Sequence, residues 1–485
     1  MTSIALSPDA LNADADPVPL VIDVDGTLIK TDLLYESALQ FVAKHPLQVH
    51  RLPLWLSNGK AHLKTALADR IEVNGHTIPL RHEVVELIAE AKAQGRPVFL
   101  ASASERRWVQ AIADAIGPLA GVFATDAATN LEGDRKAAAL EAAFGAGGFD
   151  YVGNQDVDIP VWRKARRAIV VAETSAFESR VLRALPDAEV LARPRTQLRR
   201  YVKALRVHQW AKNVLVFLPL LASHRFTLED VLAALLAFVC FSLAASSAYI
   251  LNDLLDLPAD REHRTKSRRP FAAGDVPVLH GVAMVPALAA AAFLTALLLP
   301  PRFAVILALY YASTIVYSLI LKRRVLVDVI TLAGLYTIRV FGGVAALSMA
   351  WSPWLMMFSL FLFLSLAAVK RCSELIDRQK AGKEPPPGRG YHFEDLRVML
   401  PLGVAAGYGA VAVVALYLNS PEVRALYEHP NRLWLLCPIV LYWISRILIL
   451  CNRGQMHEDP VVFATTDKVS LLTAAAGIAV VVFSA

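Results

Sequence analysis

The feature that most constrains this chain is a series of long apolar runs that begins near residue 214. Several of the runs reach the ~20 residues with which an α-helix crosses a bilayer, and short charged loops separate them. The runs are Val231–Leu251, Gly281–Pro300, Phe303–Leu321, Val325–Ala346, Pro353–Val369, Met399–Leu418, Leu433–Cys451 and Ser470–Ala485. A shorter run, Val214–Ser223, spans only if its helix extends back to Trp210. The sequence therefore predicts an all-α membrane domain of nine transmembrane helices over residues 213–485.

The charged loops predict an orientation for these helices. Lys and Arg are concentrated in the loops at residues 261–269, 322–324 and 370–389. With nine spans and a cytoplasmic start, all three loops fall on the cytoplasmic side, as the positive-inside rule requires. Residues 1–16 are polar and lack the basic and apolar regions of a signal peptide. We therefore expect a multi-pass protein of the inner (plasma) membrane with a cytoplasmic N-terminal domain.

Residues 1–185 have the pattern of a soluble α/β domain. Short apolar segments alternate with helical segments such as Arg81–Gln94 and Arg106–Ile116. Besides the strand that ends at Asp23, the expected strands are Pro97–Ala101, Gly121–Ala124, Phe149–Gly153 and Ala168–Ala172. This alternation predicts a Rossmann-like parallel sheet covered by helices on both faces. The insert Thr31–His82, which contains HLKTALADRI, predicts a small helical cap.

Polar side chains follow several of the predicted strands. They are Asp23 and Asp25 in DVDGT, Ser102, Lys136 in NLEGDRK, and Asn154, Asp156 and Asp158 in GNQDVD. Sites in parallel sheets lie at the carboxyl ends of the strands, so we expect these side chains to share one site. Any one of them alone is also common as a helix cap or turn residue.

These motifs, in this order, resemble the phosphatases of the haloacid dehalogenase superfamily. The resemblance implies that Asp23 is the nucleophile that forms an aspartyl-phosphate and that Asp25 protonates the leaving group. Ser102 would hydrogen-bond the phosphoryl oxygens, and Lys136 would offset their charge. Asp158, Asp23 and the backbone carbonyl of Asp25 would bind Mg²⁺, which prefers oxygen ligands.

One residue departs from that family's pattern. Asn154 stands where an acid is common, and its amide oxygen carries no charge, so it would bind the metal more weakly. Asp156 is near enough in sequence to compensate. A degenerate domain without catalysis is the alternative.

Residues 186–212 form a basic linker between the two domains. Cationic residues alternate with apolar ones in RPRTQLRRYVKALRVHQWAKN, which suits a helix at a membrane surface near anionic headgroups. The alternative for the early arginines is a simple anchoring linker. Lys212 stands at the entry to the first span, and we expect it to bind substrate.

The most charged stretch follows the run Val231–Leu251 directly. Asn252, Asp256 and Asp260 are spaced four residues apart, so on a helix they share one face, and Asp253 flanks them. Acids this close to a bilayer need cations. Fixed lysines would serve, but the same spacing also holds Mg²⁺ against a diphosphate. The cationic residues expected to hold the remaining phosphate charge are Arg261, Lys266 and Arg269.

The pattern NDxxDxxxDRxxxxKxxRP resembles the signature of the UbiA superfamily of intramembrane prenyltransferases. The resemblance implies nine helices around a cavity and a diphosphate bound through Mg²⁺ at two acidic motifs. Asp253, Asp256 and Asp260 would be catalytic, and Asn252 would be a metal ligand with the last two. The second motif departs from the usual pair of aspartates. Its candidates in VKRCSELIDRQK are Glu374 and Asp377, with Lys370 and Arg371 beside them.

That departure, with RVHQWAKN, TIRVFGG and KRCSEL, resembles the branch of the superfamily that contains decaprenyl-phosphate phosphoribosyltransferase. The resemblance implies that phosphoribosyl diphosphate binds at the acidic motifs and that a polyprenyl phosphate is the acceptor. Arg339, at membrane depth, is expected to contact phosphate. For Arg446, pairing with a structural acid is an equal alternative, and Asp459 and Asp467 have no assigned role.

Three functions remain open from the sequence. The first is phosphoribosyl transfer, after which the fused phosphatase would remove the 5-phosphate of the product. The second is transfer of a polyprenyl chain from its diphosphate to an aromatic acceptor. The third is a membrane-anchored phosphatase whose helices are only an anchor. No nucleic-acid partner is expected.

Overall fold

The computed structural model describes residues 17–126, 130–172, 174–192, 198–223, 226–263, 265–385, 389–421, 423, 427–456 and 459–484. The prediction that residues 1–16 hold no signal peptide lies outside these residues. The chain divides into two compact units. The first unit is Met1–Leu205 with Ile250–Met284, and the second unit is Arg206–Tyr249 with Val285–Ala485. The acidic stretch expected in the membrane domain thus groups with the N-terminal residues.

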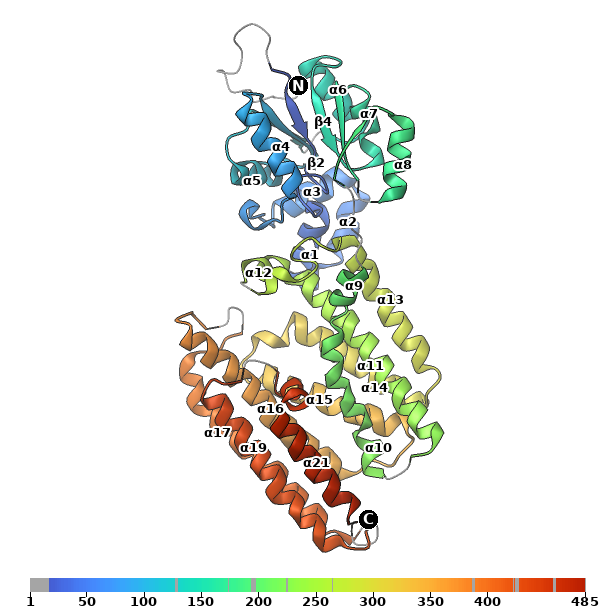
Figure 1. The fold of residues 1–485 in the computed structure, drawn as a ribbon, viewed down its shortest axis with the longest axis vertical. Coiled ribbons are helices and arrows are strands. Elements are labelled where there is room, and N and C mark those ends of the chain that lie inside the picture. The colour runs from blue at the N-terminus through green and yellow to red at the C-terminus, as the bar shows by residue number, and fades with distance from the viewer. Residues whose placement is uncertain are drawn as a thin grey trace. The chain divides into compact units, whose positions relative to one another are not determined.

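The first unit contains a six-stranded parallel sheet, which confirms the predicted α/β fold (Figure 1). Its strands are β1 (Leu20–Ile22), β2 (Val98–Glu105), β3 (Gly121–Thr125), β4 (Asp150–Gly153), β5 (Arg167–Val171) and β6 (Glu189–Ala192). The order is β3-β2-β1-β4-β5-β6, so β1 pairs on both sides and the chain reverses direction across the sheet there. Strand β6 lies beyond residue 185, in the segment expected to begin the linker.

Helices cover both faces of this sheet, because its strands are apolar on both sides. Leu20 and Ile22 pack with α4 (His82–Ala93) and α5 (Arg106–Ile116), whereas Val21 between them faces the other cluster. That second cluster includes α6 (Asp134–Phe144), α7 (Ile159–Trp162) and α8 (Ser175–Ala184). The predicted cap consists of α1 (Leu33–Lys44), α2 (Arg51–Ser57) and α3 (Lys60–Ala68). The remaining short helices of the unit are α9 (Leu198–Ala204) and α12 (Leu257–Glu262).

The described part of the chain has seven helices long and apolar enough to cross a membrane. Helices α11 (Leu228–Leu255) and α13 (Val278–Ala296) cross the division between the units, and α14 (Pro301–Leu319), α15 (Val327–Ala346), α16 (Pro353–Lys380), α17 (Leu396–Leu418) and α19 (Leu436–Asn452) lie in the second unit. Helices α20 (Pro460–Thr466) and α21 (Lys468–Val482) meet at 79° and would give an eighth span as a pair.

The run Val214–Ser223 does not form a long helix. It is divided between a 3₁₀ segment, Val207–Phe217, and the short helix α10 (Leu218–Ser223). A ninth transmembrane helix therefore stays a prediction.

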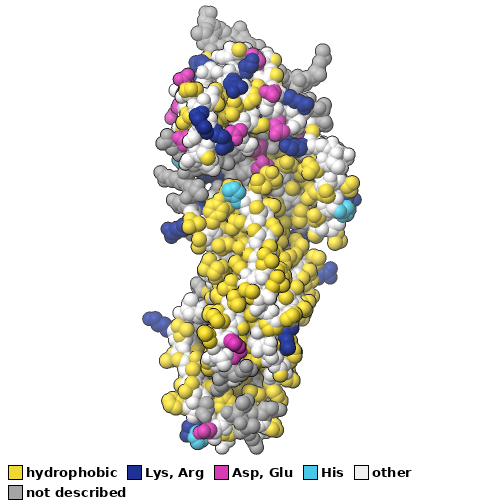
Figure 2. Space-filling view, turned by 90° about the vertical axis from the view of Figure 1, so that its right-hand side faces the viewer, with side chains coloured by type: hydrophobic (Ala, Val, Ile, Leu, Met, Phe, Trp, Pro, Cys, Tyr) yellow, Lys and Arg dark blue, Asp and Glu magenta, His cyan; other side chains and the backbone are white. Residues whose placement is uncertain are grey.

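The surface of the helical part suits a lipid environment. Figure 2 shows hydrophobic side chains spread over the face of the helices that is in view. Leu297, Leu298 and Phe483 are among the large hydrophobic residues that are mostly exposed, which is costly in water and favourable in lipid. By contrast, α15 is the most buried of the long helices and carries Asp328 and Arg339 inward, so these charges need partners within the protein.

Candidate functional sites

The predicted residues of the sheet domain meet at the carboxyl ends of β1 and β4. Lys136 Nζ, from α6, donates to Asp23 Oδ1 at 2.7 Å and to Asp158 Oδ1 at 3.4 Å. Tyr151, on β4, accepts from the same amine at 2.9 Å and donates to Asp158 Oδ1 at 2.9 Å. All four side chains are buried. The cluster therefore brings two carboxylates and a lysine to one point, as the sequence predicts.

Asp25 lies beside this cluster and accepts three hydrogen bonds. Ser102 Oγ and Ser104 Oγ donate to its Oδ2 at 2.9 and 2.7 Å, and Leu33 N, which begins α1, donates to Oδ1 at 2.9 Å. The Ser102 hydroxyl, expected on phosphoryl oxygens, is thus bonded to Asp25. The sequence analysis missed Ser104 because a second serine in SASE has no distinguishing pattern.

Burial gives the cluster unusual proton affinities. It raises the pKa of Asp23 to about 7, an effect opposed by Lys136 and increased by Asp158 and Asp25. Burial also disfavours charge on Lys136, but Asp23 and Asp158 outweigh this and raise the pKa of the amine. The site places the carboxyl groups of Asp23 and Asp158 around one amine, with Asp25 beside them, so it has more acidic than basic side chains. Its hard oxygen donors fit Mg²⁺.

Asn154 and Asp156 are placed differently from each other. Asn154 is buried, and Thr27 Oγ1 lies 3.0 Å from its Oδ1 and 3.1 Å from Asp23 Oδ2. Asp156 pairs with Arg180 at 2.8 Å near the surface. Asp156 therefore has a surface ion pair, and the side chain of Asn154 lies near Asp23 through their shared neighbour Thr27.

The cap supplies a cation that the sequence analysis did not single out. Lys64, on α3, is buried, and its Nζ donates to Ala103 O at 2.5 Å and to Asn130 Oδ1 at 3.3 Å. Burial lowers its pKa. Only the fold brings this lysine to the end of β2, so its isolated position in HLKTALADRI gave no signal.

The acidic stretch, here called the acidic segment (Asn252–Arg269), is not one continuous helix. Helix α11 ends at Leu255 and α12 begins at Leu257, with Asp256 between them. Pro258 lies in the first turn of α12 and has no N–H for continuing α11, and this proline was a signal for the break. The expectation of a single helix is therefore wrong, although helix-like bonds still link the three residues, from Asp256 N to Asn252 O and from Asp260 N to Asp256 O, both at 2.9 Å.

Two carboxylates of the acidic segment converge on one cation. Arg269 Nη1 donates to Asp253 Oδ1 at 3.1 Å and to Asp260 Oδ2 at 2.5 Å, and both acids are buried. The Arg269 guanidinium thus lies between two carboxylates. Carboxylate oxygens are hard donors, and two of them also suit a divalent cation such as Mg²⁺. Asn252, Asp256 and Lys266 have interactions of their own.

Arg261 makes a buried ion pair instead of facing an open site. Its guanidinium donates to both carboxylate oxygens of Glu36 on α1, with Nη1 to Oε2 at 2.8 Å. Its Nε donates to Ala272 O at 3.1 Å. The side chains of Arg261 and Glu36 are 4% and 2% exposed. The predicted substrate-binding arginine is therefore fully engaged with the cap helix.

In the second unit, two predicted lysines share a carboxylate. Lys212 Nζ and Lys370 Nζ lie 3.0 and 2.7 Å from Asp459 Oδ2. Tyr336 OH also hydrogen-bonds Asp459, at 2.9 and 2.8 Å from its two oxygens. Asp459 is the N-cap of α20, and its side chain accepts from Val461 N at 3.1 Å. Here the structure gives a partner to an acid whose role the sequence left open.

Arg339 is buried on α15 and bonded within the same unit. Its Nε donates to Asn213 Oδ1 at 2.8 Å, and its Nη2 donates to Tyr310 OH at 2.9 Å. The guanidinium also lies 4.7 Å from the centre of the Tyr310 ring. These contacts satisfy much of its hydrogen-bonding capacity, and phosphate contact stays a prediction.

In the second acidic motif, Glu374 is paired with arginines. Arg371 pairs with Asp328 at 2.5 Å inside the unit and also with Glu374, which Arg389 approaches at 3.6 Å. Asp377 has an interaction of its own. Arg446 binds Asp467 through two bonds of 2.7 and 3.1 Å, the structural pairing that was one of its two expected roles.

Residues 214–464 match the model of the UbiA prenyltransferase family. The chain belongs to this family. A Sinorhizobium fredii protein, y4nM, is 36% identical to it over 457 residues, which cover 93% of this chain and 88% of that protein. The similarity to y4nM therefore includes both the sheet domain and the helices. The decaprenyl-phosphate phosphoribosyltransferase of Mycobacterium tuberculosis is 37% identical over 186 residues, which cover 37% of this chain and 62% of that enzyme.

A solved UbiA homolog from Archaeoglobus fulgidus, bound to GPP and Mg²⁺, aligns with 58% of this chain and 99% of its own, at 18% identity and a TM-score of 0.45. With its family and its seven or more apolar helices, the UbiA chain is a multi-pass membrane protein. Within the described ranges, no three His, Cys, Asp or Glu side chains form a group that could hold a metal ion. The predicted metal ligands therefore stay predictions.

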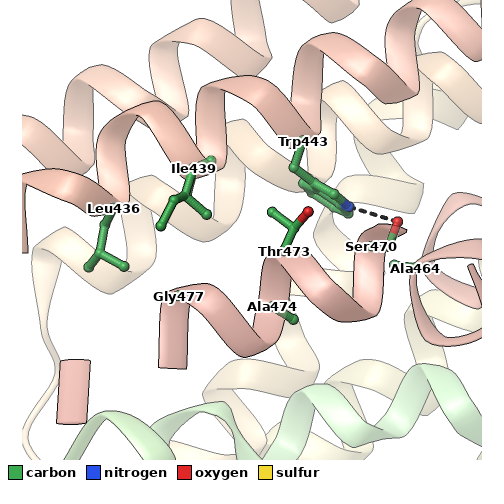
Figure 3. Close-up of a pocket in the computed structure, with 9 residues that line it drawn as sticks. Leu436, Ile439, Trp443, Ala464, Ser470, Thr473, Ala474 and Gly477 are labelled. Carbon is green, nitrogen blue, oxygen red and sulfur yellow. Dashed lines mark hydrogen bonds between the residues drawn. The ribbon is translucent and has the colours of Figure 1, made fainter. Parts of the chain in front are cut away.

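The UbiA chain also has an apolar pocket of about 250 Å³ in the second unit. Leu436, Ile439 and Trp443 of α19 face Thr473 and Gly477 of α21 across it (Figure 3). Trp443 Nε1 donates to Ser470 Oγ at 3.0 Å at one end. The lining is hydrophobic apart from these polar atoms and the Thr473 hydroxyl, and none of the predicted catalytic residues is part of it.

Proposed function

We propose that the chain is an Mg²⁺-dependent phosphoribosyltransferase that moves the phosphoribosyl group from phosphoribosyl diphosphate to a polyprenyl phosphate. An oxygen of the lipid phosphate attacks C1 of the ribose, the C1–O bond to diphosphate breaks, and diphosphate leaves. The similarity to decaprenyl-phosphate phosphoribosyltransferases supports this reaction over other chemistry of the UbiA family.

In this proposal the acidic segment binds the donor. Asn252, Asp253, Asp256 and Asp260 would hold Mg²⁺, which would supply positive charge against the diphosphate. Arg269 is paired with Asp253 and Asp260, so its guanidinium lies where it would donate hydrogen bonds to phosphate oxygens of the donor. Lys266 follows in the same segment. The second acidic motif contributes less, because Glu374 is paired with Arg371.

The observation that carries the proposal is the pair of lysines on Asp459. Two lysines share one carboxylate at 3.0 and 2.7 Å, so the group has one more basic than acidic side chain; Lys212 is buried, and Lys370 and Asp459 are partly buried. Burying a positive charge without a negative partner is costly, so such a charge favours the binding of an anion. A phosphate monoester carries up to two negative charges and suits this pair better than an aromatic acceptor does.

The sheet domain completes the proposal as a phosphatase. The transfer product carries a 5-phosphate on its ribose. Asp23 attacks this phosphorus while Asp25 protonates the departing 5-oxygen, and water then hydrolyses the aspartyl-phosphate to free phosphate. Lys136 stabilises the transferring group, and Mg²⁺ at Asp23, Asp158 and the Asp25 carbonyl would supply further positive charge. Tethering raises the local concentration of the intermediate.

The test separates the candidate reactions by the fate of a label. Purified protein in detergent is given Mg²⁺ and polyprenyl phosphate with radiolabelled phosphoribosyl diphosphate, and in parallel a labelled prenyl diphosphate with an aromatic acceptor. Label that passes from phosphoribosyl diphosphate into the lipid fraction, and is lost when Mg²⁺ is chelated, supports the proposal. Label that leaves the prenyl diphosphate for the aromatic acceptor contradicts it. Release of free phosphate from lipid-linked 5-phosphoribose tests the phosphatase.

A further inference from the structure

The ion pair between Glu36 and Arg261 joins the cap of the sheet domain to the acidic segment. The two residues are 225 positions apart in sequence, and both belong to the first unit. The pair is bidentate, and Thr31 Oγ1 donates to Glu36 Oε1 at 2.5 Å. Removing one member of such a buried pair leaves the other charge without compensation, which is strongly unfavourable.

A second contact joins the same two parts without using charge. The turn Phe271–Asp275, which follows the acidic segment, packs against Lys30 and Pro79. Gly274 has a φ of +68°, and a Cβ at this position would lie 2.5 Å from Lys30 Cβ and 3.2 Å from Pro79 Cγ. Lys30 lies in the loop that follows Asp23 and Asp25. Only a residue without a side chain allows this approach.

These contacts matter because α12 cannot hold its own position. It has six residues, and a helix this short has little stability without tertiary contacts. Asp260 and Arg261 are neighbours on it, so the anchor of Arg261 on Glu36 also fixes where the Asp260 carboxylate lies. Asp260 in turn meets Asp253 at Arg269.

We propose that Glu36 of the cap is a positioning residue for the transferase, and that it sets the geometry of the acidic segment through Arg261. The sheet domain then contributes to the binding of the diphosphate donor as well as hydrolysing a phosphate ester. The expected change in transferase activity rests on the proposed function. The contact between Glu36 and Arg261 does not depend on that function.

Coupling runs in both directions along α1. Helix α1 carries Glu36, and its first residue, Leu33, donates its N–H to Asp25 Oδ1 at 2.9 Å. A ligand that moves Asp25 therefore acts on the same helix that anchors Arg261. By linkage, occupancy of the donor site and of the Asp23 site then influence each other.

The test uses the full chain in detergent and two variants that break the contact differently. Glu36→Gln keeps the shape of the side chain and removes its charge, whereas Gly274→Ala leaves every charge in place and pushes the turn away from Lys30. Both variants are expected to raise the KM for phosphoribosyl diphosphate about 10- to 100-fold, with a smaller change in kcat, the range for residues that orient groups in contact with a ligand. Both are expected to speed hydrogen exchange in residues 256–275. Glu90→Gln, an exposed acid on α4, is the matched control and changes neither.

The outcomes are distinct. Unchanged KM and unchanged exchange in both contact variants overturn the inference. If Glu36→Gln speeds exchange throughout the sheet, it has unfolded the domain, and Gly274→Ala then decides. If the unmodified protein transfers no label, the proposed function fails, whereas the exchange of residues 256–275 still shows whether the contact orders the acidic segment.

Discussion

Lys212 and Lys370 converge on one oxygen of Asp459, although the two lysines are 158 positions apart in sequence. One reaches it from a 3₁₀ segment and the other from α16. Tyr336 completes the contacts of this acid. The two amines therefore lie close together without an added ligand, because both are attracted to the same carboxylate. One carboxylate can offset only one of two positive charges.

The first prediction concerns Lys370. We expect Lys370→Met to raise the KM for polyprenyl phosphate about 10- to 100-fold, because one of the two cations for the lipid phosphate is lost. The measurement is transfer of labelled phosphoribose at varied lipid concentration. Lys383→Met, an exposed lysine beyond the end of α16, is the control and should behave as the unmodified protein. An unchanged KM in Lys370→Met would place the lipid phosphate elsewhere.

The second prediction separates the transferase from a simple anchor. Asp256→Ala should reduce phosphoribosyl transfer by about 100-fold or more, since it removes a carboxylate that would hold the Mg²⁺ needed to offset the charge of the departing diphosphate. Hydrolysis of a small phosphate ester should stay intact. Glu262→Ala, at the exposed end of α12, should keep both activities. If Asp256→Ala leaves transfer unaffected, the acidic segment is not the donor site.

The third prediction concerns a substitution in the sheet domain that should remove phosphate release and keep phosphoribosyl transfer. Asp23→Asn should abolish phosphate release, because the amide is not a nucleophile, and should leave transfer in place. The lipid product should then accumulate with its 5-phosphate, which mass spectrometry detects. Asp187→Asn, on the exposed surface, serves as the control. Rapid phosphate release by Asp23→Asn would exclude the aspartyl-phosphate route.

Sequence patterns were sufficient where the signal is local. The apolar runs predicted the long helices, and DVDGT predicted an acidic cluster at the end of β1, because strand polarity brings such residues to one edge. Patterns failed where partners come from distant segments. Nothing in LYESAL marks Glu36 as the partner of Arg261, and nothing near Lys212 indicates Asp459. The break at Asp256 was predictable from Pro258, but the acidic spacing favoured one helix.

The last prediction concerns pH and the N-cap of α1. Burial raises the pKa of Asp32 from 3.8 to about 7, with a further contribution from Asp25, although its side chain caps Leu34 N at 2.9 Å. An acid whose pKa is raised in the folded state stabilises that state fully below its ordinary pKa. This stability is lost as the pH rises towards 7 and stays lost above it.

Asp32→Asn removes that charge and keeps the cap, since Asn is as good an N-cap as Asp. Asp32 is partly exposed, so water screens part of the cost, and we expect the Tm of the first unit to rise by about 2–4 °C at pH 8. The difference between variant and unmodified protein should shrink steadily as the pH falls from 7 towards 4. Thermal melts of the full chain in metal-free detergent buffer measure it. A Tm difference that is the same at every pH, or a variant that is less stable at pH 8, would show that Asp32 is charged at no cost in the folded protein.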